Sequence, residues 1–146
     1  MPQARPTAPS SPLQSLVHLL HRAGQRADSL FADRVGDIVT PRQFAVLQAV
    51  AEADGLSQTG IMAATGIDRS SIADLVRRLV SQGWLQRRRT KRDARLYAVR
   101  LTPEGRRIWS EAAPALRATE EMLLSSLTSS ERVAFTKVLA VIASIG

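Results

Sequence analysis

The alternation of apolar and polar residues predicts a chain made mostly of helices. Near the start, Ser11 and Gln14 have the spacing of a capping box, with Pro12 at the first helical position. Apolar side chains then recur every three or four residues as far as Phe31. We therefore expect a long first helix that ends near Gly36.

Three shorter helices are expected next, each with a polar N-cap and a glycine near its end. The expected caps are Thr40, Ser57 and Asp68, and the glycines are Gly55, Gly66 and Gly83. The last of these helices carries an apolar stripe, which comprises Ile72, Leu75, Val76 and Leu79. Residues 65–68 form a connection as short as the turn of a helix-turn-helix.

The next two runs, residues 84–88 and 96–101, contain apolar, aromatic and β-branched side chains and predict a two-stranded hairpin. Seven basic residues and a single acid, Asp93, lie between Arg87 and Arg100. This concentration of like charge suits a polyanion, because phosphates would neutralise it with release of counterions. A basic loop that only improves solubility is the alternative interpretation.

Two more helices complete the predicted chain. Thr102 and Pro103 open the first of them, and Pro114 should bend its axis. Thr128 and Glu131 form a capping box ahead of a terminal amphipathic helix. The predicted fold is mainly α, with a winged helix-turn-helix lobe, a two-stranded β wing and long helices at both ends.

Composition narrows the classes of protein. The chain has 146 residues, 45% of them hydrophobic, which suits one globular domain over residues 11–146. Residues 1–10 are rich in Pro, Ser, Thr and Ala and are expected to form a disordered tail. The lack of cysteine and the presence of only two histidines argue against metal sites, cofactors and an enzyme. No apolar run could span a bilayer, so a cytoplasmic protein without a membrane partner is expected.

The polar side of the fourth predicted helix is a candidate DNA-binding surface. At about 100° per residue, Ser70, Asp74 and Arg77 lie opposite the apolar stripe, with Arg78 at the flank. Short side chains permit close approach to the major groove, where Arg69 or Arg77 could bind guanine. The candidate contacts here are Asp68, Arg69, Ser70, Ser71, Asp74, Arg77 and Arg78. A solvated helix face is the alternative.

The basic hairpin is the second candidate DNA-binding surface. Asp93 is placed to pair with Arg95 and to hold its guanidinium forward, where a narrow minor groove would attract it. An exposed pair of this kind contributes little stability, so orientation is its expected role. The candidate contacts in the hairpin are Arg87, Arg88, Arg89, Lys91, Arg92, Asp93 and Arg95.

A set of residues in this region follows one family pattern. It comprises Asp68, Ser70, Ser71, Leu75, Val76, Leu79, Gly83, Trp84, Leu85, Arg88, Asp93, Arg95, Leu101, Thr102 and Gly105. On these residues the segment 57–105 resembles the MarR family of bacterial transcription regulators. Thr90 and Lys91 depart from the Asp-Pro common before the family's wing turn, and Ala94 stands where a second arginine is frequent.

The resemblance implies a homodimeric regulator, most similar to those of aromatic-compound catabolism. Residues 11–36 and 103–146 would form the dimerisation helices, and residues 40–101 the DNA-binding lobe. Apolar stripes on both terminal helices independently favour a partner chain. The implied target is double-stranded DNA with an inverted-repeat operator. Family members commonly repress transcription and release DNA when a small molecule binds, often an aromatic or phenolic acid or its thioester.

The identity of such an effector is unknown from the sequence. Candidate contacts are His18, His21, Arg22, Arg26, Phe44 and Trp109, because a cation beside aromatic walls would suit an anionic aromatic ligand. Taken singly, a Trp or Phe on an apolar stripe is more typical of a core, and a histidine on the first helix of a surface or dimer contact. The alternative function is an effector-independent or architectural winged-helix protein that binds unrelated duplexes.

Overall fold

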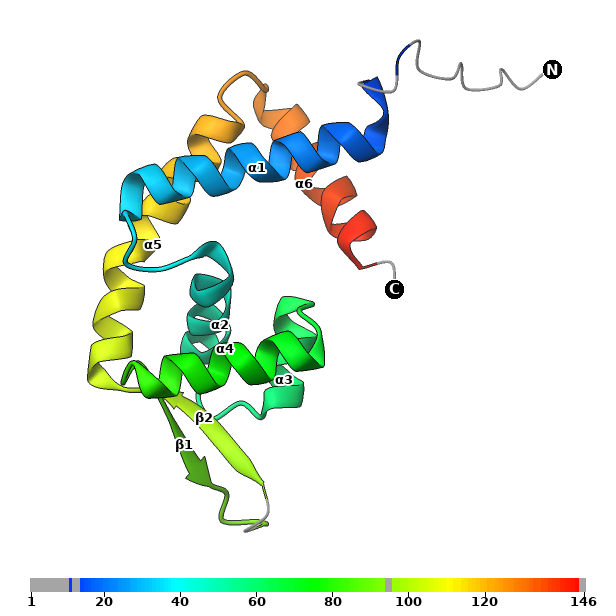
Figure 1. Ribbon diagram of the computed structural model, residues 1–146. Coiled ribbons are helices and arrows are strands. Elements are labelled where there is room, and N and C mark those ends of the chain that lie inside the picture. Colours follow the sequence, from blue (N-terminus) through cyan, green and yellow to red (C-terminus); the bar gives the residue numbers. More distant parts are fainter. Residues whose placement is uncertain (1–10, 12–13, 94–95, 145–146) are drawn as a thin grey trace, which may run out of the picture.

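The computed structural model describes residues 11, 14–93 and 96–144. Its elements are α1 (Leu16–Val35), α2 (Pro41–Glu52), α3 (Gln58–Thr65), α4 (Arg69–Ser81), β1 (Leu85–Arg89), β2 (Tyr97–Leu101), α5 (Pro103–Leu123) and α6 (Ser129–Ala143). Helices α2 to α4 and the β1–β2 hairpin form one lobe, and α5 connects this lobe to α1 and α6 (Figure 1). The predicted mainly helical, winged helix-turn-helix fold is confirmed.

Polar caps and glycines delimit most of the helices where the sequence predicts. Thr40 Oγ1 accepts from the Gln43 N–H, and Gln43 Oε1 accepts from the Thr40 N–H, so the capping box before α2 is complete. Thr128 and Glu131 form the same reciprocal pair before α6. After α3, Gly66 has a φ of 68°, a left-handed conformation that residues with a side chain adopt less readily.

The predicted start of the first helix is wrong, because α1 begins after Ser15 and not after Ser11. The Ser15 Oγ accepts from the His18 N–H at 3.2 Å and so caps the helix. The Gln14 N–H instead donates to the Ser11 carbonyl in a turn that precedes α1. Pro12, predicted at the first helical position, lies outside the described residues.

The hairpin strands begin one residue later than predicted. The Trp84 N–H donates to the Leu79 carbonyl at 2.9 Å, which completes the end of α4 and leaves the next residue to begin β1. The helix-turn-helix connection is residues 66–68, because Thr65 still belongs to α3. Helix α5 continues through Pro114 as one helix.

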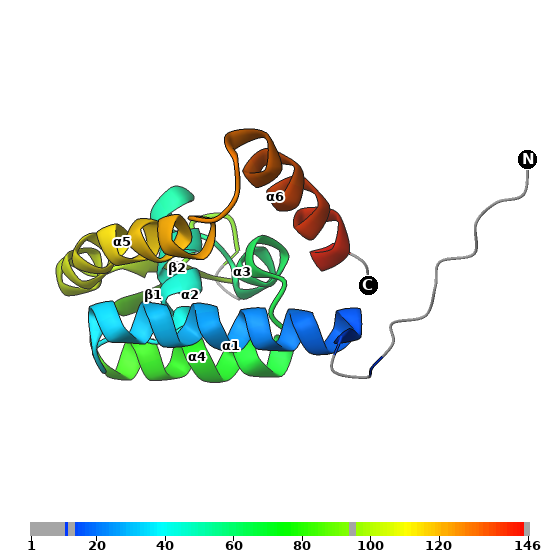
Figure 2. The same ribbon diagram turned by 90° about the horizontal axis from the view of Figure 1, so that it is seen from above.

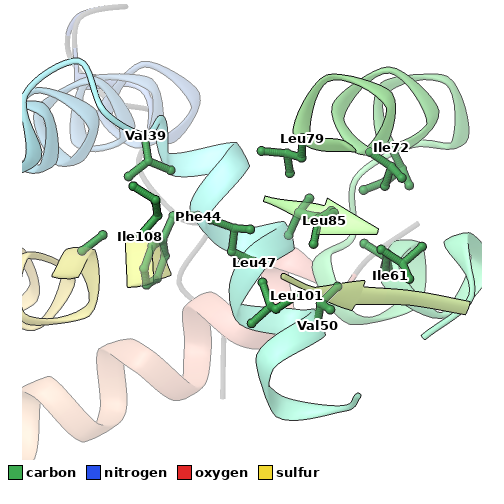
Figure 3. Packing of buried hydrophobic residues seen from close by; sticks show 14 of the residues in the cluster. Val39, Phe44, Leu47, Val50, Ile61, Ile72, Leu79, Leu85, Leu101 and Ile108 are labelled. Atoms are coloured by element: carbon green, nitrogen blue, oxygen red, sulfur yellow. The ribbon is translucent and has the colours of Figure 1, made fainter. Parts of the chain in front are cut away.

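Helix α2 lies at the centre of the lobe, where it packs on α3, α4, α5 and β2. Its buried residues Phe44, Leu47 and Val50 meet apolar side chains from all of these elements (Figure 3). The labelled partners are Val39, Ile61, Ile72, Leu79, Leu85, Leu101 and Ile108. The centroids of the Phe44 ring and the Phe31 ring on α1 are 5.8 Å apart, so the same core extends to the first helix.

Helix α6 turns back from the end of α5 and stands apart from the lobe (Figures 1 and 2). None of its residues is buried, and Val133, Val138 and Val141 expose 71, 56 and 59% of their surface. Leu16 and Val17 on α1 are exposed as well. Apolar exposure on this scale is typical of a contact surface. No helix in the described part of the chain is both long and apolar enough to cross a membrane.

The first turn of α5 is tightly packed against the start of the hairpin. The Thr102 hydroxyl caps α5 by accepting from the Gly105 N–H at 3.0 Å, and it donates to the Gly83 carbonyl. A Cβ at Gly105 would lie only 1.9 Å from the Trp84 carbonyl oxygen and 2.7 Å from its carbon. Because both are backbone atoms that cannot rotate away, this position accepts only glycine.

Replacing Gly105 with Ala should therefore destabilise the protein by about 2 kcal/mol or more, since α5 must move away from Trp84. Urea unfolding followed by circular dichroism measures this loss. Ser110→Ala, on the exposed side of the same helix, is the control and should stay within about 0.5 kcal/mol of the wild type. Equal stability of the two variants would contradict the close contact.

Candidate nucleic-acid interface

The outward side of α4 carries the polar residues that the sequence predicts. Ile72, Val76 and Leu79 are fully buried against the lobe. Ser70 and Arg77, on the opposite side, are exposed. The α4 helix and the hairpin lie at the end of the molecule remote from α1 (Figure 1).

Asp68 is the N-cap of α4 and organises its first turn. Its carboxylate accepts from the Ser71 N–H at 2.9 Å, the Ser71 hydroxyl at 2.7 Å and the Ser70 hydroxyl at 2.8 Å. Bonds from Ser71 and then Ser70 hold the Asp68 pKa far below its usual value. Because Ser70 donates its hydroxyl hydrogen to Asp68, its oxygen is left as an acceptor on the outward surface.

Asp74 lies one turn further along α4 and contacts two arginines. Its Oδ1 accepts a hydrogen bond from Arg77 Nη2 at 2.5 Å, and its Oδ2 forms an ion pair with Arg78 Nε at 2.8 Å. All three side chains keep 40% or more of their surface exposed. Within the predicted recognition surface, Asp74, Arg77 and Arg78 thus form one connected set of charges.

The hairpin strands pair in antiparallel register, with Arg87 opposite Val99 and Arg89 opposite Tyr97. Because strand side chains alternate between faces, Arg87 and Arg89 share one face with Tyr97. The Arg89 guanidinium lies over the Tyr97 ring, 5.8 Å from its centroid. One face of the wing therefore combines two arginines with an aromatic ring.

Arg100 holds the hairpin to the rest of the lobe. It pairs at 2.9 Å with Asp54, which lies in the loop between α2 and α3, so it anchors the base of the wing. At the tip, Thr90 accepts from the Asp93 N–H and donates to the Asp93 carbonyl. The predicted pair of Asp93 with Arg95 involves a residue outside the described ranges.

A groove of about 280 Å³ separates the hairpin from α3 and α4. Arg69 from α4 and Arg87 from β1 both line it, so the structure brings together the two candidate surfaces predicted separately. Its remaining lining, which the sequence analysis missed, comprises Ser57, Gln58, Thr59, Met62, Ala73, Leu96, Tyr97 and Val99. Strand alternation could have identified Tyr97, but the approach of α3 depends on tertiary packing.

The six candidate effector contacts fall in three places. Phe44 is buried in the core beside Phe31, and the half-buried Trp109 donates its Nε1–H to Gln48 Oε1 at 2.7 Å. The other four lie on one side of α1, where they form a basic stripe of His18, His21, Arg22 and Arg26. The aromatic contact of Phe44 with α1 is made at Phe31, more than one helical turn beyond the basic stripe.

A second cavity, of about 670 Å³, lies between α1, α5 and α6 and is mainly apolar. Leu20, Gly24 and Ala27 line it from the side of α1 opposite the basic stripe. Phe135 and Leu139 line it from α6. None of the six candidate effector contacts lines this cavity or the groove beside the wing.

Comparisons with known proteins agree with this architecture. The MarR family model matches residues 39–96. The transcriptional repressor NicR of Pseudomonas putida is 31% identical over 122 residues, which cover 83% of this chain and 77% of NicR. The structure of BpsR from Bordetella bronchiseptica, whose DNA binding is regulated by 6-hydroxynicotinic acid, has a TM-score of 0.88 at 28% identity and covers 95% of this chain and 100% of that one.

A mutant of MarR from Escherichia coli, solved in complex with operator DNA, has a TM-score of 0.79 at 25% identity. The match covers 87% of this chain and 92% of that protein. Proteins of this family regulate transcription and are not enzymes. The winged helix-turn-helix lobe, the identity to NicR and the family model together establish that this chain belongs to the MarR family of DNA-binding transcription regulators.

Proposed function

We propose that this protein is a cytoplasmic homodimeric repressor that binds an inverted-repeat operator and releases it when a small aromatic acid binds. The observation that carries the proposal is the groove in which Arg69 of α4 and Arg87 of the wing lie on one surface. Together with the other basic residues of the hairpin, this surface matches the charge of a DNA duplex.

The two parts of the surface would have different tasks. The α4 side chains Ser70 and Arg77 would enter the major groove, where base edges are distinguishable. The basic wing residues would contact phosphates, which supply affinity without reading sequence. A MarR neighbour solved with operator DNA supports DNA binding by this fold. An architectural protein, the alternative, would bind unrelated duplexes with similar affinity.

Dimerisation would cover the exposed apolar residues of α1 and α6. Val133, Val138 and Val141 make α6 unfavourable as an isolated surface in water. A second copy offers the same apolar residues and closes the contact by two-fold symmetry. Two lobes related in this way would face two half-sites about one helical turn of DNA apart, or a multiple of that spacing.

The effector would be an anionic aromatic compound. The basic stripe on α1, which includes Arg22 and Arg26, offers positive charge outside the DNA-binding surface. A carboxylate would pair with such cations, and the aromatic ring would then rest against an apolar surface that the partner chain completes, because the cavity between α1, α5 and α6 lies on the other side of α1. BpsR, which is similar over nearly the whole chain, responds to 6-hydroxynicotinic acid and so supports this ligand class.

Replacing Arg87 with Ala should weaken binding to the DNA upstream of the protein's own gene, because one phosphate contact is lost. The slope of the logarithm of affinity against the logarithm of salt concentration should become shallower by about one unit. Fluorescence anisotropy across a series of salt concentrations measures both quantities. Arg117→Ala on α5 removes the same charge away from the wing and should leave the slope unchanged. An unaltered slope in Arg87→Ala would rule out a phosphate contact at this residue.

The wild-type chain should sediment at twice the mass of one chain, and the double variant Val138→Asp, Val141→Asp should sediment as a monomer. Two carboxylates in an apolar interface would be desolvated without partners, which strongly disfavours association. Analytical ultracentrifugation at micromolar concentration measures both. Ser110→Asp is the control for an added acid. A wild-type monomer at these concentrations would contradict the dimer.

6-Hydroxynicotinate should raise the thermal midpoint of the protein and release it from its DNA, whereas the corresponding carboxamide should do neither. The difference follows from pairing of the carboxylate with the basic stripe on α1. Arg22→Ala should diminish both effects, and Arg117→Ala should retain them. Equal effects of the acid and the amide would show that the carboxylate is not recognised.

A further inference from the structure

We propose that Asp74 is a positioning residue that orients Arg77 and Arg78 for operator recognition and does not itself bind DNA. This inference rests on the proposed DNA-binding function and identifies what sets its specificity. Both oxygens of the Asp74 carboxylate contact an arginine: Oδ1 accepts a hydrogen bond from Arg77 Nη2 at 2.5 Å, and Oδ2 forms an ion pair with Arg78 Nε at 2.8 Å. The carboxylate is therefore already paired with both arginines in the protein without DNA.

The charge of Asp74 is unfavourable for simple attraction to DNA. The residue lies on the outward side of α4 between Ser70 and Arg77, where phosphates and base edges would approach. An acid in that position repels phosphates, so a surface selected only for affinity would carry a neutral or basic side chain. An acid here would lower the affinity for DNA of any sequence, and we infer that it improves discrimination between operator and other sequences.

The two arginines lie on different sides of α4. Arg77 lies on the outward side, and Arg78 lies at the flank of the helix. Their side chains are 69% and 64% exposed, so each would sample many rotamers without a fixed partner. The Asp74 carboxylate restricts both, which favours a bidentate contact of Arg77 with guanine and a phosphate contact of Arg78.

Stability alone does not account for these ion pairs. Exposed pairs three and four residues apart on a helix contribute little to folding. Arg107 on α5 forms a similar cluster, with Glu104 and Glu111, on a helix that offers no DNA-facing surface in the proposed complex. That cluster provides a control, because it also pairs arginine with carboxylates three and four residues away on an exposed helix face, with one arginine between two acids instead of one acid between two arginines.

The test compares Asp74→Asn with the wild type on two duplexes of equal length and composition. One duplex carries the site selected in vitro by the wild-type protein from random DNA, and the other carries a scrambled sequence. We expect Asp74→Asn to bind the scrambled duplex more tightly, because a negative charge is lost. We also expect the ratio of the two affinities to fall about tenfold, because Arg77 is no longer held.

Two variants separate positioning from charge. Glu111→Gln removes an arginine-paired carboxylate from α5 and should change both affinities by the same factor, which leaves their ratio unaltered. In an Arg77→Ala background, Asp74→Asn should have much less effect on the ratio, because the residue through which it acts is absent. Thermal midpoints verify that each variant is folded.

The outcomes are distinguishable from a failure of the proposed function. A wild-type protein that binds both duplexes equally would overturn the proposed operator recognition, and the role of Asp74 with it. A discriminating wild type together with an unchanged ratio in Asp74→Asn would overturn only the role of Asp74. If Asp74→Asn lowers the ratio of the two affinities equally in the wild type and in the Arg77→Ala background, Asp74 contacts DNA directly.

Discussion

The contact between the first turn of α5 and the carbonyl of Trp84 is the constraint on which the rest of the structure depends. At this point α4 has just ended, β1 is about to begin and β2 has just delivered the chain into α5. Gly105 lets the backbone of α5 reach Trp84, and Thr102 closes the junction by bonding to Gly83. The directions of α4, the wing and α5 are therefore fixed relative to one another at this junction.

The charges of the proposed DNA-binding surface are arranged in two ways. On α4, acids accompany the basic residues, with Asp68 bonded to Ser70 and Ser71 and Asp74 bonded to its arginines. In the described part of the wing, Arg87 and Arg89 share a face with an aromatic ring. Bound acids reduce general attraction to phosphates while they fix geometry, so selectivity would reside mainly in α4 and affinity mainly in the wing.

Local signals made much of the fold predictable. The caps at Thr40, Ser57 and Asp68 and the glycine at position 66 act within one helical turn, so the sequence around each suffices to identify it. The start of α1 was mistaken because Ser11 and Ser15 both precede apolar residues, and only the folded chain distinguishes them. The pairing of Asp54 with Arg100 joins residues far apart in sequence, which no spacing rule anticipates.

The second strand of the wing is attached on both of its edges. Besides its pairing with β1, the Val99 N–H donates to the Leu56 carbonyl at 2.7 Å, and Arg100 binds Asp54 beside it. The base of the wing is thereby fastened to the loop between α2 and α3, so the wing is joined to the helices of the lobe at two places. In the proposed dimer, a change carried by α5 would then alter the separation of the two lobes more easily than the shape of either one. The spacing between half-sites, rather than the fit to each half-site, would be the quantity that a ligand controls.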